Sequence, residues 1–149
     1  MKPLRLFREY LAEGVVKKQP PDIPRSKSLV IEAENSYSAL MESVEKLGIS
    51  DKNANLTIKN AYDIVMELVR SKMLLSGLNP IGLGAHEAEV AYLRDLGFSA
   101  SDVEFANQLR YFRNGITYYG KSFDADYAKK VVEFLKKMYP KLRGQKMVI

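Results

Sequence analysis

The chain has 149 residues, the length of one ordinary domain, and such a chain buries roughly two thirds of its unfolded surface without a covalent or metal staple. Apolar residues make up 46% of it and charged residues 28%, proportions that argue against a disordered, collagenous or membrane protein. There is no cysteine and only one histidine, His86, so disulfides, thiolate catalysis, iron–sulfur clusters and cysteine-based zinc sites are excluded. We therefore expect no metal ion and no cofactor.

The net charge of +5 is unevenly distributed along the chain. Residues 1–27 have seven basic and three acidic side chains (+4), residues 28–98 have six and ten (−4), and residues 99–149 have ten and five (+5). Basic ends beside an acidic middle are compatible with a phosphate-bearing partner, and equally with a lysine-rich surface that is simply solvated. No segment resembles a targeting signal or a membrane span, so we expect no membrane partner and a cytoplasmic location.

The first 27 residues are predicted to form a short helix and then a connector. The helix is expected from about Pro3 to Glu13, where apolar residues recur on one side. The connector, Gly14 to Lys27, contains three prolines, which lack a backbone donor and bias the preceding residue away from helix, so we expect it to be extended. Its basic side chains could follow a nucleic-acid backbone, or they could belong to a solvated loop: Lys17, Lys18, Arg25 and Lys27.

Residues 28–149 are predicted to be the main domain. Apolar residues recur there every three or four positions without sustained alternation, which is typical of amphipathic helices and gives little indication of strands. We expect an all-α fold, an antiparallel up-and-down bundle of four main helices plus short flanking helices, in a single domain. The helices are predicted at about residues 28–47, 55–76, 86–96, 101–119 and 124–139.

Local signals predict where these helices begin and end. Gly48 follows the first main helix, whose inward stripe of apolar residues ends at Leu47, and glycine is common just beyond a helix C-terminus. Ser101 and Glu104 have the spacing of a capping box, which predicts that a helix opens there. Pro140 is predicted to limit the last helix.

The segment Leu109–Gly120 carries the residues best suited to chemistry. On a helix, two arginines, an amide and several hydroxyls lie on one flank of its apolar stripe, near the C-terminal end. Arginine at the edge of an apolar surface binds phosphate or carboxylate strongly, and a tyrosine ring can stack on a base. The candidates for binding a phosphate or nucleotide are Arg110, Arg113, Asn114, Thr117 and Tyr118. Alternatively, both arginines pair with acidic residues of the middle region and only orient helices.

The region from Phe98 to Leu142 resembles the C-terminal half of HEPN-domain proteins, which are small helical bundles of prokaryotes. In that family an arginine followed by a polar residue ends a bundle helix, and a histidine and often a tyrosine come after it. Arg113-Asn114 matches the start of this motif, and Tyr119 resembles the aromatic position that trails it. The resemblance covers about residues 28–142. It implies a homodimer, a nucleotidyltransferase-type protein partner, and RNA or a nucleotide as ligand.

The sequence departs from this family at the residue that catalysis needs. In catalytic members the arginine and the histidine, contributed twice across a homodimer, are thought to form a metal-independent ribonuclease site. Tyr118 stands where the resemblance places that histidine, and no histidine follows His86. An imidazole exchanges protons near neutral pH, whereas a tyrosine titrates near about 10 and is a poor base. We therefore assign no catalytic residue and keep Arg113 as a phosphate-facing candidate.

His86 is the secondary candidate for a site. It begins a predicted helix after Gly84-Ala85, a position that could lie near a cleft. A single histidine in the first turn of a helix can equally be a surface or packing residue. Glu87 and Glu89 stand beside it, but two acids in one turn without a second ligand do not make a metal site.

Three functions remain open at this point. The first is a non-catalytic, HEPN-like helical module that binds a nucleotide, RNA or a nucleotidyltransferase-type partner. The second is a metal-independent ribonuclease or toxin of the HEPN type with a degenerate motif, using Arg110, Arg113 and Tyr118. The third is a purely structural interaction protein whose arginines form salt bridges. The missing histidine favours the first function over the second.

Overall fold

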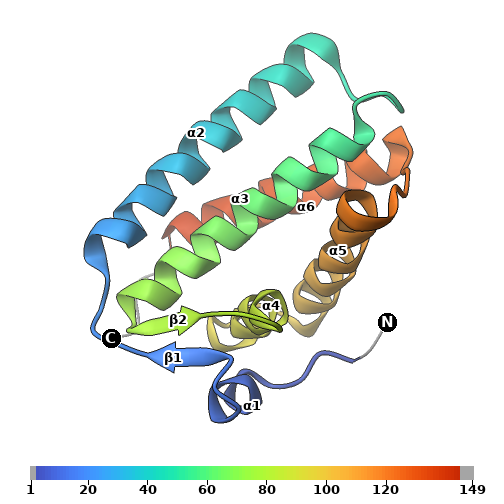
Figure 1. Ribbon diagram of the computed structural model, residues 1–149. Coiled ribbons are helices and arrows are strands. Elements are labelled where there is room, and N and C mark those ends of the chain that lie inside the picture. Colours follow the sequence, from blue (N-terminus) through green and yellow to red (C-terminus); the bar gives the residue numbers. More distant parts are fainter. Residues whose placement is uncertain (1–2, 145–149) are drawn as a thin grey trace.

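The computed structural model describes residues 3–144, and within them the chain is mostly helical, as predicted (Figure 1). Two short strands form the single small sheet of the described residues. No helix in this part of the chain is both long and apolar enough to cross a lipid bilayer. The elements in chain order are α1 (Phe7–Ala12), β1 (Val16–Lys18), α2 (Ile23–Leu47), α3 (Ala54–Leu75), β2 (Leu78–Pro80), α4 (Ala85–Asp95), α5 (Ala100–Tyr119) and α6 (Ala125–Gly144).

Helix α3 is the centre of the molecule. It packs against α2, α6, α5, α4 and β2, and Figure 1 shows α2 running beside it and α6 lying behind it. Its apolar side chains are buried against several of these neighbours. The buried apolar residues of α3 include Ile58, Ala61, Tyr62, Val65, Leu68, Val69 and Met73.

The small sheet attaches the N-terminal segment to the helices. Strands β1 and β2 are antiparallel, with Val16 opposite Pro80 and Lys18 opposite Leu78. The ladder is continued by Gln19, whose N–H donates to the carbonyl of Gly77 at 2.9 Å. The sequence did not predict this sheet, but the expectation of a mainly helical chain is confirmed. Strands of three residues are too short to show the alternation that predicts a strand.

Helix α2 begins inside the segment predicted to be an extended connector. Its first residue is Ile23, and the Asp22 carboxylate accepts a hydrogen bond from the N–H of Arg25 at 3.1 Å. Pro24 is tolerated because the first turn of a helix has no intrahelical partner for its N–H groups. The predicted start at residue 28 was too late, because a proline in the first turn does not prevent a helix from forming.

Two other helix boundaries also needed correction. The cap of α5 is Ser99, whose hydroxyl accepts from the N–H of Asp102 at 3.1 Å, so Ser101 lies within the helix. Pro140 lies inside α6, which continues to Gly144 and brings the buried Leu142 into the core. Packing of this last turn outweighs the one backbone hydrogen bond that the proline removes.

The predicted ends of α2 and α5 are confirmed, but one predicted core residue is not. Gly48 and Gly120 are the C-caps, with φ of 71° and 64°, in the left-handed region that favours glycine. Leu47 was predicted to face inward and is 78% exposed, because the last turn of α2 extends beyond the helices that cover its inner face.

Candidate functional site

The C-terminal half of α5 carries the five candidate residues, and they lie in four separate environments. Arg110 is buried and fully engaged. Its Nε donates to Asn107 Oδ1 at 3.1 Å and its Nη1 donates to Glu87 Oε1 at 3.0 Å. The Glu87 side chain is partly exposed and belongs to α4. Arg110 therefore links α5 to α4. This pairing with an acidic residue matches the alternative interpretation of the sequence, in which the arginine orients helices.

Arg113 faces α3. Its Nη2 lies 3.5 Å from Asp63 Oδ1, and its Cζ lies 5.8 Å from the centre of the Tyr62 ring. Its side chain is 21% exposed, and its buried Nε has no hydrogen-bond partner among the described residues. Burial raises the pKa of the Asp63 carboxyl, and the positive charge of Arg113 partly opposes that rise. The long contact to a half-exposed carboxylate holds this guanidinium only weakly.

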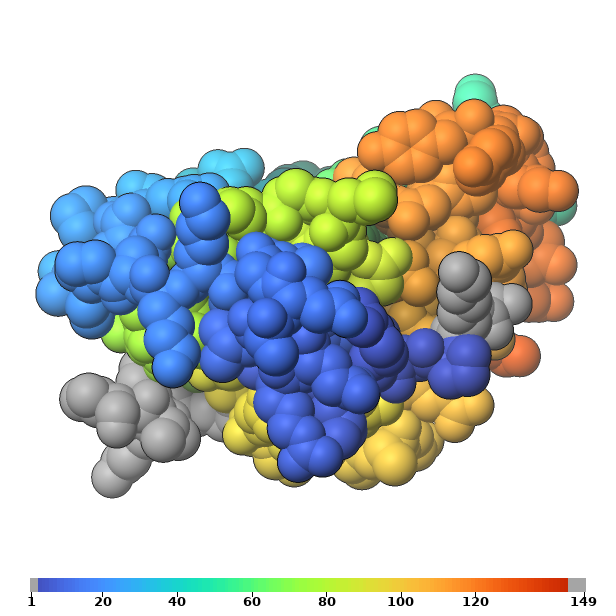
Figure 2. Space-filling model, turned by 60° about the horizontal axis from the view of Figure 1, so that its bottom comes forward, coloured from blue at the N-terminus to red at the C-terminus, as the bar shows by residue number. Residues whose placement is uncertain are grey.

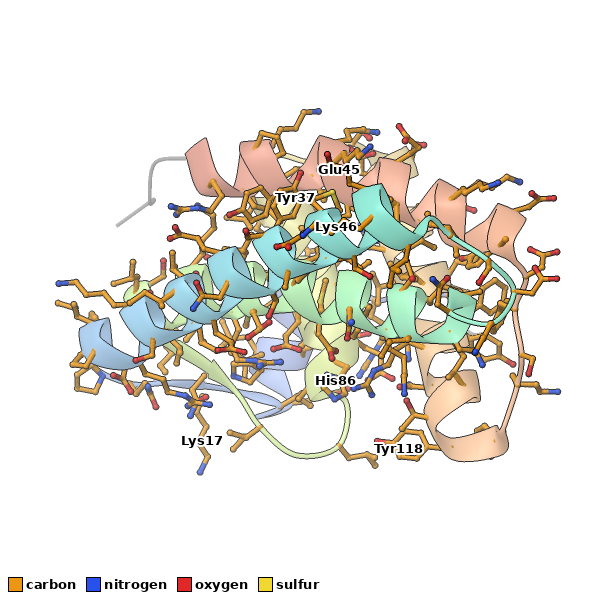
Figure 3. The ribbon with its side chains drawn as sticks, turned by 90° about the horizontal axis from the view of Figure 1, so that it is seen from above. Lys17, Tyr37, Glu45, Lys46, His86 and Tyr118 are labelled. Atoms are coloured by element: carbon orange, nitrogen blue, oxygen red, sulfur yellow. The ribbon has the colours of Figure 1, made fainter. Side chains whose placement is uncertain are left out.

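Asn114 and Tyr118 line one cavity at the end of α5, which we call the α5-end cavity. Its volume is about 440 Å³, and the rings of Tyr111, Phe112 and Tyr119 also line it. Tyr118 and Tyr119 are exposed. Figure 3 shows Tyr118 at the periphery of the molecule. Lys121, Gly115 and Phe123 complete the lining, while Thr117 is exposed and is not part of it.

A fixed turn and an aromatic cluster support this cavity. The Asn55 side chain holds the turn after α5, because its Oδ1 accepts from the N–H of Phe123 at 2.9 Å and its Nδ2 donates to the carbonyl of Lys121 at 3.0 Å. Beneath the cavity the rings of Phe112 and Phe123 lie 4.8 Å apart, and both contact Tyr127. Burial raises the pKa of Tyr127 to about 12. The floor of the α5-end cavity is thus formed by packed rings.

His86 lies at a second cavity, of about 410 Å³, between α2, α3 and α4, which we call the three-helix cavity. Its Nδ1 is 3.2 Å from Oε1 of the buried Glu89. Glu89 also accepts two hydrogen bonds from Arg70, at 2.5 Å from Nε and 3.2 Å from Nη2. In Figure 3, His86 and Tyr118 lie apart along the same side of the molecule. The structure therefore does not bring His86 into the α5-end cavity.

Sequence reasoning missed the polar residues of α3 that line the three-helix cavity. Asp63, Glu67 and Arg70 are spaced four and three positions apart, so they share one face of a helix whose other faces are apolar. That spacing indicates a polar face on this helix and could have been recognised in the sequence. The more extensive apolar stripe of the same helix obscured it.

Exposed apolar side chains surround the end of α5. Leu83, in the loop between β2 and α4, is 98% exposed, and Tyr111 is exposed as well. Both line a further cavity of about 750 Å³ beside the N-terminal segment, together with Arg110. In Figure 2 the N-terminal segment lies across this face, and the end of α5, in orange, forms a raised lobe at its edge.

The described residues contain no group of three or more acidic or histidine side chains placed to hold a metal ion. Comparison with protein-family models, with curated proteins and with solved structures found no match to this chain. Membership of the HEPN family consequently stays a prediction from the residues around Arg113.

Proposed function

We propose that this protein is a non-catalytic, HEPN-like helical module that binds a nucleotide or RNA at the α5-end cavity. One observation supports this most directly. Asn114 and Tyr118, both predicted from the sequence, line one cavity together with further aromatic rings and Lys121. Aromatic rings stack on bases, an amide bonds to base edges, and an ammonium group binds phosphate. The cavity is thus equipped for each part of a nucleotide.

The absence of catalysis follows from the groups available there. The lining of the α5-end cavity includes no histidine and no carboxylate, so it has no general base suited to neutral pH. His86 lies at a different cavity and contacts Glu89. The ligand would be held and not cleaved.

We further propose that α2, α3, α5 and α6 form an antiparallel up-and-down bundle that dimerises in the cytoplasm. Short connections between α2 and α3, and between α5 and α6, favour antiparallel neighbours. The exposed side chains of Leu83, Tyr111 and Tyr119 offer a second copy an apolar surface beside the cavity. A nucleotidyltransferase-type partner, which the resemblance implies, is the second candidate for this surface.

Binding can be measured by calorimetry with adenosine monophosphate and by fluorescence anisotropy with a short single-stranded RNA. Tyr118→Ala should weaken binding by roughly fivefold to a hundredfold, because each stacked base contributes about 1–3 kcal/mol. Lys121→Ala should weaken binding and reduce its dependence on salt. Lys46→Ala is the matched control, since Lys46 is exposed on α2 and lies on the opposite side of the molecule from Tyr118 (Figure 3).

Three results would refute parts of the proposal. Undetectable binding of both ligands at low salt would favour a purely structural protein. RNA cleavage by the wild type that is lost in Arg113→Ala would establish the ribonuclease alternative. A monomer in size-exclusion chromatography at high protein concentration would exclude the homodimer.

A further inference from the structure

The three-helix cavity is lined mainly by polar side chains. Its volume of about 410 Å³ falls within the range of about 300–1,000 Å³ that is usual for small-molecule sites. Glu32 comes from α2, Asp63 and Glu67 come from α3, and His86 comes from α4. Every residue that lines this cavity belongs to residues 28–98, the part of the chain with ten acidic and six basic side chains.

The positive groups at this cavity already have partners. Arg70 forms two hydrogen bonds with Glu89, and Arg113 lies against Asp63. Glu32 and Glu67 are different, because neither carboxylate forms an ion pair within residues 3–144. The cavity thus presents two carboxylates whose charge the rest of the described structure leaves uncompensated.

The pKa of Glu67 reflects this lack of compensating positive charge. Burial first, and then the nearby charges of Glu32 and Asp63, raise its pKa to about 7 against the opposing effect of Arg70. A cation placed between Glu32 and Glu67 would remove the repulsion between them. It would also keep the Glu67 carboxylate ionised at neutral pH.

One residue that lines the cavity also has a buried polar atom without a partner. Tyr62 lines the cavity and is only 3% exposed, and its hydroxyl forms no hydrogen bond with any described residue. Buried hydroxyl groups nearly always have a partner, so an unsatisfied one indicates that something else completes the site. A hydroxyl oxygen can accept a hydrogen bond from an ammonium or guanidinium group.

Two other kinds of ligand fit this cavity less well. The carboxylates of Glu32 and Glu67 would repel an anion, and Arg70, the arginine that lines the cavity, is already paired with Glu89. The acidic and histidine side chains of the described residues do not form a group of three placed to hold a metal ion. An organic cation remains, because its N–H groups can reach carboxylates that are spread over two helices.

We propose that the three-helix cavity binds a small organic cation bearing amino or guanidino groups, with Glu32 and Glu67 pairing with its charge and the Tyr62 hydroxyl accepting one of its hydrogen bonds. This inference does not depend on the proposed nucleotide site, because Asn114 and Tyr118 line a separate cavity. The cation can be a free amine or the side chain of a lysine or arginine in a partner protein.

Titration with agmatine, which carries a guanidinium and an ammonium group, tests the proposal by NMR or calorimetry at low ionic strength. We expect a Kd of about 1 mM or tighter. Glu67→Gln should weaken binding about tenfold, in line with the loss of one charge-assisted hydrogen bond, and Tyr62→Phe should weaken it about fivefold. Glu32→Gln should act like Glu67→Gln, and it changes only an exposed side chain, so it will fold.

Glu45→Gln is the matched control, because Glu45 is exposed on the same helix as Glu32 and lies on the opposite side of α2 from His86 (Figure 3). A tripeptide with a central lysine and blocked ends distinguishes the sources of the cation. Binding of agmatine alone indicates a free amine, and binding of the peptide alone indicates a partner side chain. The proposal is wrong if neither binds, or if Glu45→Gln weakens binding as much as Glu67→Gln.

Discussion

Replacing Arg70 by leucine should destabilise the protein strongly. The carboxylate of Glu89 is 1% exposed, and Arg70 supplies two hydrogen bonds to it, at 2.5 Å and 3.2 Å. Removing one partner of a buried ion pair costs about 3–5 kcal/mol, because the other charge stays buried without compensation. We expect the lower half of that range, since the Arg70 side chain is 25% exposed and His86 remains 3.2 Å from Glu89.

Urea denaturation followed by circular dichroism measures this loss. A loss of about 3 kcal/mol corresponds to a decrease in Tm of roughly 6–12 °C for a chain of this size. Lys46→Leu is the control, because its pair with Glu42 is nearly as short, at 2.7 Å, but both side chains are exposed, and such pairs contribute about 0–1 kcal/mol. The double variant Arg70→Leu/Glu89→Leu should regain part of the lost stability. Equal losses in Arg70→Leu and Lys46→Leu would refute this reasoning.

Two further changes have expected outcomes. Gly77→Ala should destabilise the protein by at least about 2 kcal/mol in the same urea experiment, because φ is +73° and the added Cβ would lie 2.5 Å from the carbonyl oxygen of Gln19; a loss below about 0.5 kcal/mol, the usual limit for a surface substitution, would contradict this. Because the pKa of Glu67 is raised in the folded state, the folded protein holds this proton more tightly than the unfolded chain does. The free energy of unfolding should therefore fall as the pH rises from about 4.5 to 7. We expect a loss of about 1 kcal/mol, allowing for solvent screening of this half-exposed group. Glu67→Gln cannot titrate at this position, so its difference from the wild type in free energy of unfolding should change over the same pH range. A constant difference would show that Glu67 does not cause the pH dependence of stability.

The helices could be predicted because their buried faces require apolar residues at the spacing of a helical turn. Both broad faces of α3 are buried, and its apolar residues therefore recur without interruption. Proline was the least reliable predictor of helix boundaries, since its effect depends on where in the helix it lies. Pro24 lies in the first turn of α2, where no intrahelical hydrogen bond is lost, and Pro140 lies in the last turns of α6, where packing outweighs the lost bond.

The candidate site could be predicted only where its contacts are local. Asn114 and Tyr118 are one turn apart on α5, so the sequence alone places them together. Arg110 finds Glu87 on α4, and Arg113 finds Asp63 on α3, and no helical period in the sequence specifies contacts between helices. The sequence therefore placed both arginines on one flank of α5 but could not show that each has a partner on a different neighbouring helix.

Asp63 connects the two candidate sites. Its carboxylate lines the three-helix cavity and is also the contact that holds Arg113 on α3. Burial raises the pKa of this carboxyl, and the positive charge of Arg113 partly opposes that rise. The same carboxylate therefore contributes both to the charge of the three-helix cavity and to the position of Arg113.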